Sequence, residues 1–216
     1  NTGININSFN SEYLKILDNN CTSVKIYGIK IDETDVIIDN NNINLSRACA
    51  IGIYTSRDYN PSNIVIDNVD IGLPQLSNTT KIRPLLFNQE YGGYHDVYVS
   101  NTTTIDGTQV LSYYGVDNHT LDLAGLKKSM VIMYNSNNNT ISNLNVNKAH
   151  GLYMEKVNNC TFSNISLSDN YYNGLTTSHC KNNTFIGVNA SNNNANGIVL
   201  NAFSHLPDFN RENRVI

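Results

Sequence analysis

The sequence contains no tryptophan, few prolines and few charged residues. Of its 216 residues 15% are charged, and 18 acidic against 14 basic side chains give a net charge of −4. Proteins that bind nucleic acids carry a basic surface that neutralises phosphates. The charge balance therefore excludes nucleic acid as an expected partner.

Long apolar runs are also missing. No stretch approaches the roughly 20 apolar residues that a transmembrane helix needs, and no basic segment followed by an apolar one opens the chain. We expect no insertion into a membrane. Any export signal, or any segment that attaches the protein to a virion, is expected to lie outside this sequence.

Cysteine is scarce and irregularly spaced. Cys21, Cys49, Cys160 and Cys180 show neither a CxxC spacing nor a histidine at zinc-ligand spacing, so no structural metal site is expected. Four cysteines are too few for a disulfide scaffold in a chain of this length. We predict that they are small, buried, apolar residues.

The end of the chain repeats with a fixed period. Gly151, Gly174 and Gly197 follow one another at intervals of 23 residues. An alternating apolar and polar run and an Asn-rich turn precede each glycine, and a short apolar run such as 152–154 follows it. Alternation indicates strands with one buried face, and a fixed period of roughly 20 to 50 residues indicates a solenoid.

Earlier segments have the same character. The runs 24–26, 36–40, 64–71 and 97–101 each read as a strand, and most of them lead into Asn-rich turns. Asn suits such corners because it tolerates left-handed backbone angles, and stacked Asn side chains can form ladders. Leucine-rich repeats would place Leu and Asn at fixed offsets, and a β-sandwich would not repeat its glycines so regularly. The sequence predicts an all-β, right-handed parallel β-helix of roughly seven to nine coils, each with two or three strands.

We expect residues 1–216 to form one β-helix domain that is a piece of a longer solenoid. Segments 72–96 and 121–134 lack the coil pattern, so they are expected to be loop insertions on the binding face. The tail ends on Arg214, Val215 and Ile216 without a polar cap. Because an open solenoid end exposes strand edges, further coils or a partner chain are expected there.

The chemistry is expected at Tyr114, Asp117 and His119, which place a phenol, a carboxylate and an imidazole within six residues. Simple alternation along a strand cannot put all three on one face, but Gly115 permits a bend. A Tyr and His pair can take a proton from one side of a sugar carbon and return it on the other. The alternative interpretation makes Tyr114 and Val116 core residues and His119 a surface turn residue.

The motif Tyr-Gly-x-Asp-x-His at 114–119 resembles the catalytic motif of mannuronan (alginate) C-5 epimerases, which are right-handed parallel β-helix enzymes. Asn118 stands where that family has Pro. The segment 151–155 resembles the family's Gly-Phe segment, which ends in a catalytic Asp, so the resemblance assigns Glu155 to the acidic position. The resemblance to this family covers roughly residues 81 to 207, and its most specific part is the hexapeptide 114–119.

The resemblance also implies substrate-binding residues. The coil at 173–175 matches the family's His-Gly-Phe coil, with Tyr172 where the family has Arg. Lys81 or Arg83 lies near the position of the family's lysine that binds the substrate carboxylate. His150, directly before Gly151, is the remaining candidate, and the alternative interpretation, which the sequence favours, makes it a turn or ladder residue.

Two classes of function follow from these residues. The first is a C-5 epimerase or lyase on an acidic, alginate-like polysaccharide. In this reaction Tyr114 and His119 exchange protons with C5 of the sugar. Asp117 and Glu155 orient Tyr114 and His119, and a cation neutralises the substrate carboxylate. Return of the proton gives an epimerase, and departure of the 4-O group gives a lyase. We expect no cofactor, because the sequence shows no recognisable calcium-ligand cluster. Calcium stays an alternative, since several β-helix lyases use it.

The alternative function is a phage tailspike or appendage. Such a protein would be a homotrimer that binds or depolymerises a host surface glycan, with hydrolysis by a carboxylate pair such as Asp117 and Glu155. Its coils would be rich in Asn and poor in Lys, as they are here. Both functions place the protein outside the cell, either secreted or on a virion surface.

Overall fold

The computed structural model is an all-β, right-handed parallel β-helix, as the sequence predicts. It describes residues 2–7, 14–24, 26–32, 35–45, 49–55, 64–73, 83–89, 97–201 and 212–216, and no helix occurs among them. The chain divides into two compact units, Asn1–Val110 and Leu111–Ile216. The expectation of a single domain stays a prediction.

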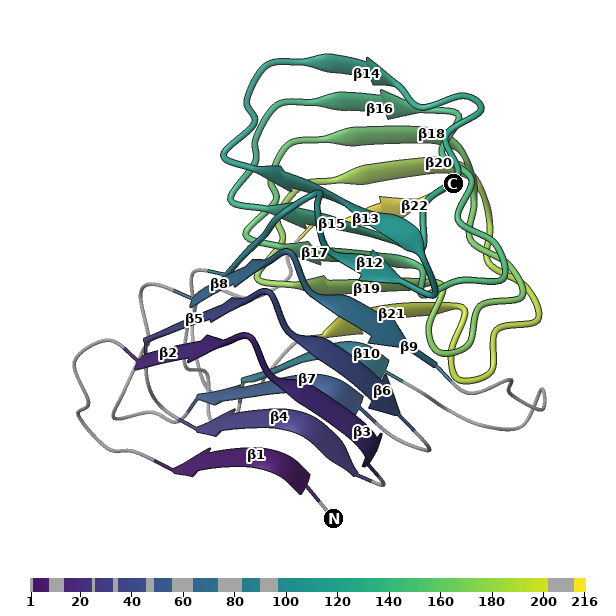
Figure 1. The fold of residues 1–216 in the computed structure, drawn as a ribbon. Helices are drawn as coiled ribbons and strands as arrows, with labels where there is room; N and C mark the ends of the chain where they lie inside the picture. Colours follow the sequence, from purple (N-terminus) through teal and green to yellow (C-terminus); the bar gives the residue numbers. More distant parts are fainter. Residues whose placement is uncertain are drawn as a thin grey trace. The chain divides into compact units, whose positions relative to one another are not determined.

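Each turn of the first unit contributes three strands, which line up in three parallel ladders (Figure 1). The first ladder contains β1 (Thr2–Asn7), β4 (Tyr27–Asp32), β7 (Cys49–Thr55) and β10 (Arg83–Gln89). The second contains β2 (Leu14–Leu17), β5 (Val36–Asp39), β8 (Ile64–Asp67) and β11 (Val97–Val99). The third contains β3 (Asn20–Val24), β6 (Asn42–Leu45), β9 (Asp70–Gly72) and β12 (Thr104–Ile105).

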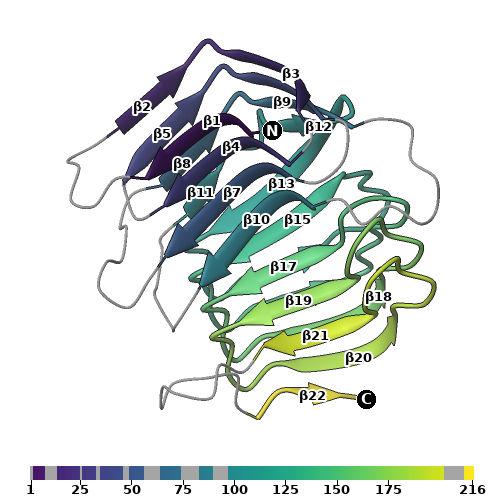
Figure 2. The same ribbon diagram turned by 90° about the horizontal axis from the view of Figure 1, so that it is seen from below.

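Each turn of the second unit contributes two strands. Figure 2 shows one ladder side by side: β13 (Thr108–Tyr114), β15 (Met130–Tyr134), β17 (Leu152–Glu155), β19 (Leu175–Ser178) and β21 (Ile198–Asn201). The other contains β14 (Thr120–Asp122), β16 (Thr140–Ser142), β18 (Thr161–Ser166), β20 (Thr184–Asn189) and β22 (Arg214–Val215). The alternating apolar positions of these strands point inward, as the period of two predicts.

Stacked apolar side chains form the core of both units. In the first unit most inward positions are β-branched, and ten isoleucines are at most 1% exposed: Ile29, Ile31, Ile38, Ile43, Ile51, Ile53, Ile64, Ile66, Ile71 and Ile105. In the second unit the Phe162 and Phe185 rings stack with centroids 4.8 Å apart. The four cysteines are buried and none of them forms a disulfide, which agrees with their prediction as small buried residues.

Asparagine holds the corners between strands, as predicted. Asn118, Asn138, Asn159 and Asn182 lie one above another at a single corner, and all four have left-handed φ angles between 53° and 59°. Side-chain ladders join successive turns, for example Asn182 Nδ2 donating to Asn159 Oδ1 at 2.9 Å. Asn therefore both permits the bend and links the turns.

The two segments expected to be loops contain strands, so that expectation is wrong in part. Strand β10 lies within 72–96 and pairs in parallel with β7. Pro84 is compatible with this strand because β10 is the last strand of its ladder among the described residues, where a missing N–H is tolerated. Within 121–134, the five residues of β15 are all buried. A continuously buried strand shows no alternation of apolar and polar residues, so the sequence did not reveal it. The loop in this segment is limited to 123–129.

A short hairpin connects β12 to β13. The two strands pair antiparallel, and Asp106 and Gly107 between them have φ angles of 50° and 68°. Two consecutive positive φ angles define a type I′ turn, for which Asp-Gly is a preferred sequence. The sequence therefore contained this signal, but the solenoid interpretation passed over it.

Asn183 is expected to contribute strongly to stability. It is fully buried, its Oδ1 accepts from Cys160 N at 2.9 Å, and its Nδ2 donates to Val157 O at 2.8 Å. In Asn183→Ala both backbone groups lose their partner, so the free energy of unfolding should fall by about 2–4 kcal/mol in urea titrations. The exposed Asn145→Ala should change it by less than about 0.5 kcal/mol. Equal effects would contradict a special role for the buried Asn.

Candidate functional site

The motif residues lie at one corner of the second unit, between β13 and β14. Strand β13 ends at Tyr114, and Gly115 turns the chain with a left-handed φ of 64°. The Gly115 N–H still donates to Tyr134 O at 3.0 Å, so the corner remains attached to the next turn. Asp117 forms an isolated parallel bridge with Asn137. The bend that the sequence required at Gly115 is present.

The imidazole of His119 is held by the corner backbone. Its Nδ1 donates to the carbonyl oxygen of Asp117 at 2.6 Å. A carbonyl oxygen can only accept, so Nδ1 carries the proton and the Nε2 of a neutral ring carries the lone pair. The side chain is exposed. The corner thus presents an oriented nitrogen base to solvent.

The Asp117 carboxylate organises the corner. Its Oδ1 accepts from the Asn137 backbone N at 2.6 Å and from Asn137 Nδ2 at 3.1 Å. Asn137 Oδ1 in turn accepts from Asn158 Nδ2 at 3.0 Å. This chain of bonds fixes the backbone carbonyl that holds His119. Asp117 therefore acts on His119 through the backbone.

Tyr114 is part of an aromatic stack. Its ring is parallel to that of Tyr134, with centroids 5.7 Å apart and an interplanar angle of 7°. Tyr134 is buried at 1% exposure, whereas Tyr114 is 41% exposed. The Lys156 ammonium lies 5.4 Å from the Tyr134 ring centroid. Sequence reasoning missed Tyr134 and gave Lys156 no role at the site, because only the register of the turns places them beside Tyr114.

Glu155 does not join the motif residues. It pairs in register with Tyr134, which lies between it and Tyr114, so it is two strand spacings, about 10 Å, along the ladder. Its side chain is 0% exposed and accepts from the Tyr153 hydroxyl at 2.8 Å. Burial, together with the Glu155 charge, raises the pKa of Tyr153 well above its usual value. The structure thus separates this carboxylate from His119.

The candidate substrate-binding residues are dispersed. Lys81 lies outside the described residues, and Arg83 begins β10 in the first unit with its side chain outside them. Tyr172 is half-buried before β19, where its carbonyl accepts from Ala195 N at 3.0 Å. It lies at the opposite end of β19 from Ser178, the residue in register with Glu155. None of these described positions adds a side chain to the corner.

His150 is buried at the start of the β17 turn. Its ring lies 5.5 Å from the Tyr171 ring, and neither nitrogen has a hydrogen-bond partner among the described residues. Burial lowers the pKa of His150 from 6.5 to about 3, so the ring is neutral near pH 7. A buried neutral ring of this kind contributes to the packing of the turn.

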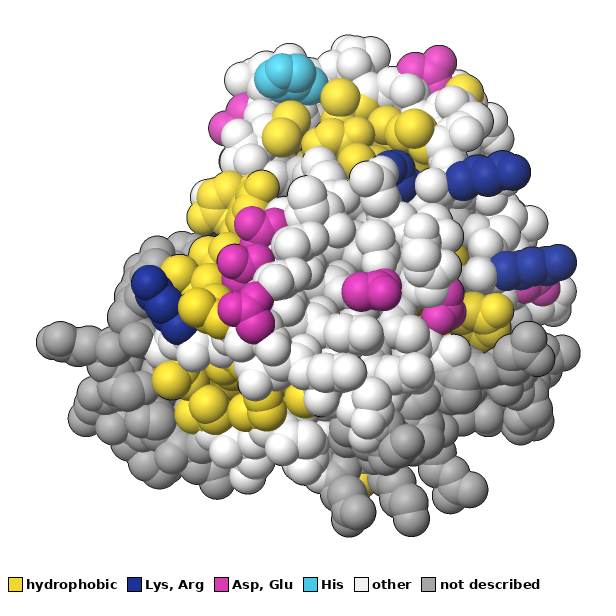
Figure 3. All heavy atoms as spheres, viewed as in Figure 1, with side chains coloured by type: hydrophobic (Ala, Val, Ile, Leu, Met, Phe, Trp, Pro, Cys, Tyr) yellow, Lys and Arg dark blue, Asp and Glu magenta, His cyan; other side chains and the backbone are white. Residues whose placement is uncertain are grey.

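The described surface provides few features for ions. On the face drawn in Figure 3 the surface is mostly uncharged, with scattered Lys and Arg side chains and a row of adjacent Asp or Glu side chains. No three His, Cys, Asp or Glu side chains of the described residues are grouped to hold a metal ion. In the described part of the chain no helix is long and apolar enough to cross a membrane.

The sequence matches no protein-family model and no curated protein. Among solved structures it is similar to HetL, a pentapeptide repeat protein involved in heterocyst differentiation regulation from the cyanobacterium Nostoc sp. strain PCC 7120. The identity is 11%, the match covers 92% of this chain and 88% of that chain, and the TM-score is 0.20. At these values the likeness carries no argument about the site or its chemistry.

His150 should make the protein sensitive to acid. Its pKa is 6.5 when exposed and about 3 in the fold, so the unfolded chain binds more protons between these values. Its contribution to the free energy of unfolding should be complete above pH 6.5 and decline by roughly 1.4 kcal/mol per pH unit as the pH falls toward 3.

The comparison that isolates this effect is between wild type and His150→Phe, which keeps an aromatic ring beside Tyr171. Urea titrations from pH 7 to 4 should show a shallower loss of stability for His150→Phe. The exposed Asn145→Ala, which removes no titratable group, should keep the slope of the wild type. Identical slopes for wild type and His150→Phe would show that His150 is not buried in its neutral form.

Proposed function

We propose that the Tyr114–His119 corner acts on an acidic polysaccharide by transferring a proton at C5 of a uronic acid residue. The observation that carries this proposal is the hydrogen bond from His119 Nδ1 to the Asp117 carbonyl, which leaves Nε2 exposed as a base. Tyr114 supplies a phenol from the end of the adjacent strand. A base and an acid at one exposed corner are the requirements for proton exchange at carbon.

The proposed reaction begins when His119 Nε2 or the Tyr114 phenolate takes the C5 proton. The electron pair of the broken C–H bond moves into the substrate carboxyl group as an enediolate. If the other residue returns a proton to the opposite face of C5, the product is the epimer. If the pair instead forms a C4=C5 double bond, the 4-O-linked sugar leaves and takes up a proton.

In this proposal the neutralising cation is Lys156, whose long side chain reaches back from the next turn over the Tyr134 ring. Its ammonium lies against Tyr134, whose ring stacks on Tyr114. A cation lowers the barrier because a second negative charge develops on the carboxyl group when C5 loses its proton. This role was expected of Lys81 or Arg83. We now assign it to Lys156, within the same proposal.

The stacked Tyr114 and Tyr134 rings support sugar binding. The exposed Tyr114 ring offers an apolar surface for the C–H face of a sugar, and its buried partner fixes its orientation. Asp117 positions His119 through the backbone, while Glu155 stays outside the proton exchange.

Hydrolysis is less well supported than proton transfer. A pair of hydrolytic carboxylates must flank one glycosidic bond. Glu155 is fully buried and bonded to Tyr153, whereas Asp117 is exposed and bonded to Asn137. The tailspike alternative stays distinguishable by its hydrolytic products and by the mass of a trimer in solution.

The first experiment incubates the protein with alginate and with other uronans. A lyase produces absorbance near 230 nm, because elimination conjugates the new double bond with the carboxyl group. An epimerase changes the proton spectrum without cleaving the polymer. New reducing ends without absorbance indicate hydrolysis and would contradict the proposed proton transfer.

Two substitutions test the proton-transfer residues. Tyr114→Phe removes the phenol and keeps the aromatic stack, and His119→Gln removes the base. Each should lower kcat on the active uronan by about 100-fold or more, in line with the usual contribution of a general acid or base. Tyr98→Phe changes a similarly exposed tyrosine of the first unit and should leave kcat unchanged. Full activity in both corner variants would refute the proposal.

Lys156→Met tests the neutralising cation, because Met keeps the length of the side chain and loses the charge. A lost charge-assisted contact should lower kcat/KM by about 10- to 100-fold, with unchanged unfolding in urea. Lys148→Met, at an exposed turn of the same unit, is the matched control. If both variants behave alike, Lys156 has no specific role.

A further inference from the structure

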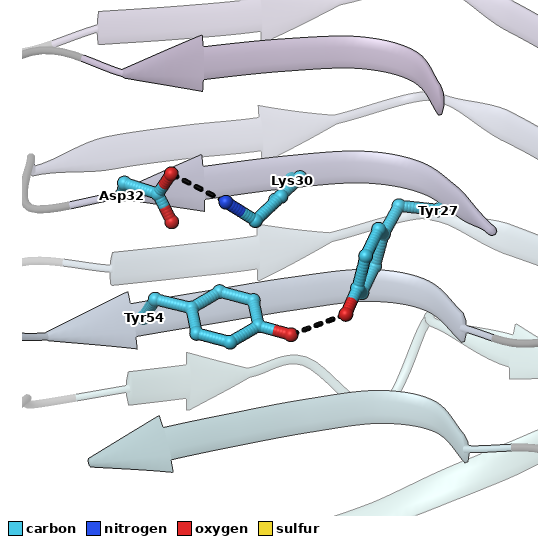
Figure 4. Close-up of polar contacts among 4 residues, drawn as sticks. All are labelled: Tyr27, Lys30, Asp32 and Tyr54. Carbon is cyan, nitrogen blue, oxygen red and sulfur yellow. Dashed lines mark hydrogen bonds and ion pairs between the residues drawn. The ribbon is translucent and has the colours of Figure 1, made fainter. Parts of the chain in front are cut away.

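A second cluster of aromatic and charged side chains lies in the first unit, on β4 and β7. The Tyr27 and Tyr54 hydroxyls hydrogen-bond to each other, and their rings meet edge to face at 6.0 Å and 82°. In Figure 4 the Tyr54 ring lies along β7, and the Tyr27 ring extends from β4 toward the Tyr54 hydroxyl. Lys30 Nζ binds Asp32 Oδ2 at 2.5 Å and lies 4.9 Å from the Tyr54 ring centroid. The two rings and the ion pair lie beside one another and form one cluster on β4 and β7.

Gly52 lies directly beneath the two tyrosine rings. It is the central residue of β7 and pairs with Lys30 without any break in register. A Cβ at this position would lie 3.0 Å from the Tyr27 ring and 3.1 Å from the Tyr54 ring. Glycine weakens the interior of a strand, and where no bulge explains it, it indicates a close approach of another group. Here the close approach is that of the two tyrosines.

The cluster is held in place but remains accessible. Lys30 and Asp32 are 26% and 23% exposed, and both tyrosines are half-buried. Burial, and then the hydrogen bond with Tyr27, raises the pKa of Tyr54 above its usual value, so its phenol stays neutral. The opposite charges of Lys30 and Asp32 leave the cluster neutral as well. It therefore offers hydrogen-bond donors, acceptors and apolar ring surface without a net charge.

From this geometry we infer that the Tyr27–Tyr54–Lys30–Asp32 cluster binds an uncharged sugar residue of a glycan. The C–H face of the sugar packs against the tyrosine rings, while neighbouring hydroxyls donate to Asp32 and accept from Lys30. A simple anion would meet the Asp32 carboxylate, and a simple cation would meet Lys30. A polyol uses both partners at once, because each hydroxyl both donates and accepts.

This site is independent of the Tyr114–His119 corner. Its residues all belong to the first unit, and its ligand is a neutral sugar, whereas the corner is proposed to take a uronic acid. The two sites can therefore be tested separately. His119→Gln provides a protein whose corner is inactive and whose Tyr27–Tyr54 cluster is unchanged.

The test measures binding of maltohexaose, cellohexaose and mannohexaose to His119→Gln by titration calorimetry. At least one of them should bind, and adding Asp32→Asn should weaken that binding by about 10-fold or more, since it removes a charged acceptor. Gly52→Ala should also weaken it, because the new methyl group displaces the rings. Asp18→Asn, at an exposed corner of the same unit, is the matched control and should bind as before.

Circular dichroism and urea unfolding of each variant separate lost binding from lost folding. Weaker binding in Asp32→Asn and Gly52→Ala at native stability supports the site. The inference is overturned if none of the three hexasaccharides binds. It is also overturned if Asp32→Asn and Gly52→Ala bind as well as Asp18→Asn, because the cluster would then only stabilise the fold. Neither result depends on activity toward uronans.

Discussion

The structure depends on parallel stacking of successive turns in register. Each strand hydrogen-bonds to the next at a spacing of about 4.8 Å, so a side chain meets its equivalent in the neighbouring turn. The corners must then bend without leaving buried backbone groups unpaired. Left-handed Asn residues make the bends, and buried amides such as that of Asn139 bond twice to the backbone of the preceding turn, accepting from His119 N and donating to Val116 O. Composition follows from this constraint, which explains the abundance of Asn.

Register also decides which residues can cooperate. Along the corner, Asp117 bridges to Asn137, Asn137 to Asn158, and Asn158 to Lys181, at separations of 20, 21 and 23 residues. A side chain reaches the adjacent turn but not the one beyond. Tyr134 therefore touches Tyr114, while Glu155, one turn further, does not share its surroundings. In this fold the side chains of one functional site therefore come from neighbouring turns and from neighbouring positions in one turn.

The sequence predicted the elements that repeat and missed those that do not. The constant glycine interval and the Asn corners identified the solenoid, and the bend at Gly115 was required by the spacing of Tyr114 and His119. The interval of 23 residues shortens to 21 between Asn137 and Asn158 and to 20 between Asp117 and Asn137, and Glu155 lies two turns from the motif. Strand β15 escaped notice because both of its faces are buried. Segment 72–96 lacks the coil pattern, which hid β10, and only the structure shows that this strand pairs with β7.

The two proposed sugar contacts show how a solenoid builds sites from different parts of its surface. At a corner, the backbone leaves the ladder, and carbonyl groups become free to hold a side chain, as the Asp117 carbonyl holds His119. On a flat ladder, the backbone groups are consumed by neighbouring strands, so orientation must come from side chains alone. That is why the Tyr27–Tyr54 cluster needs a glycine beneath its rings and an ion pair beside them. Chemistry that requires an oriented base therefore belongs at corners, and recognition by stacking and paired charges belongs on the sheet.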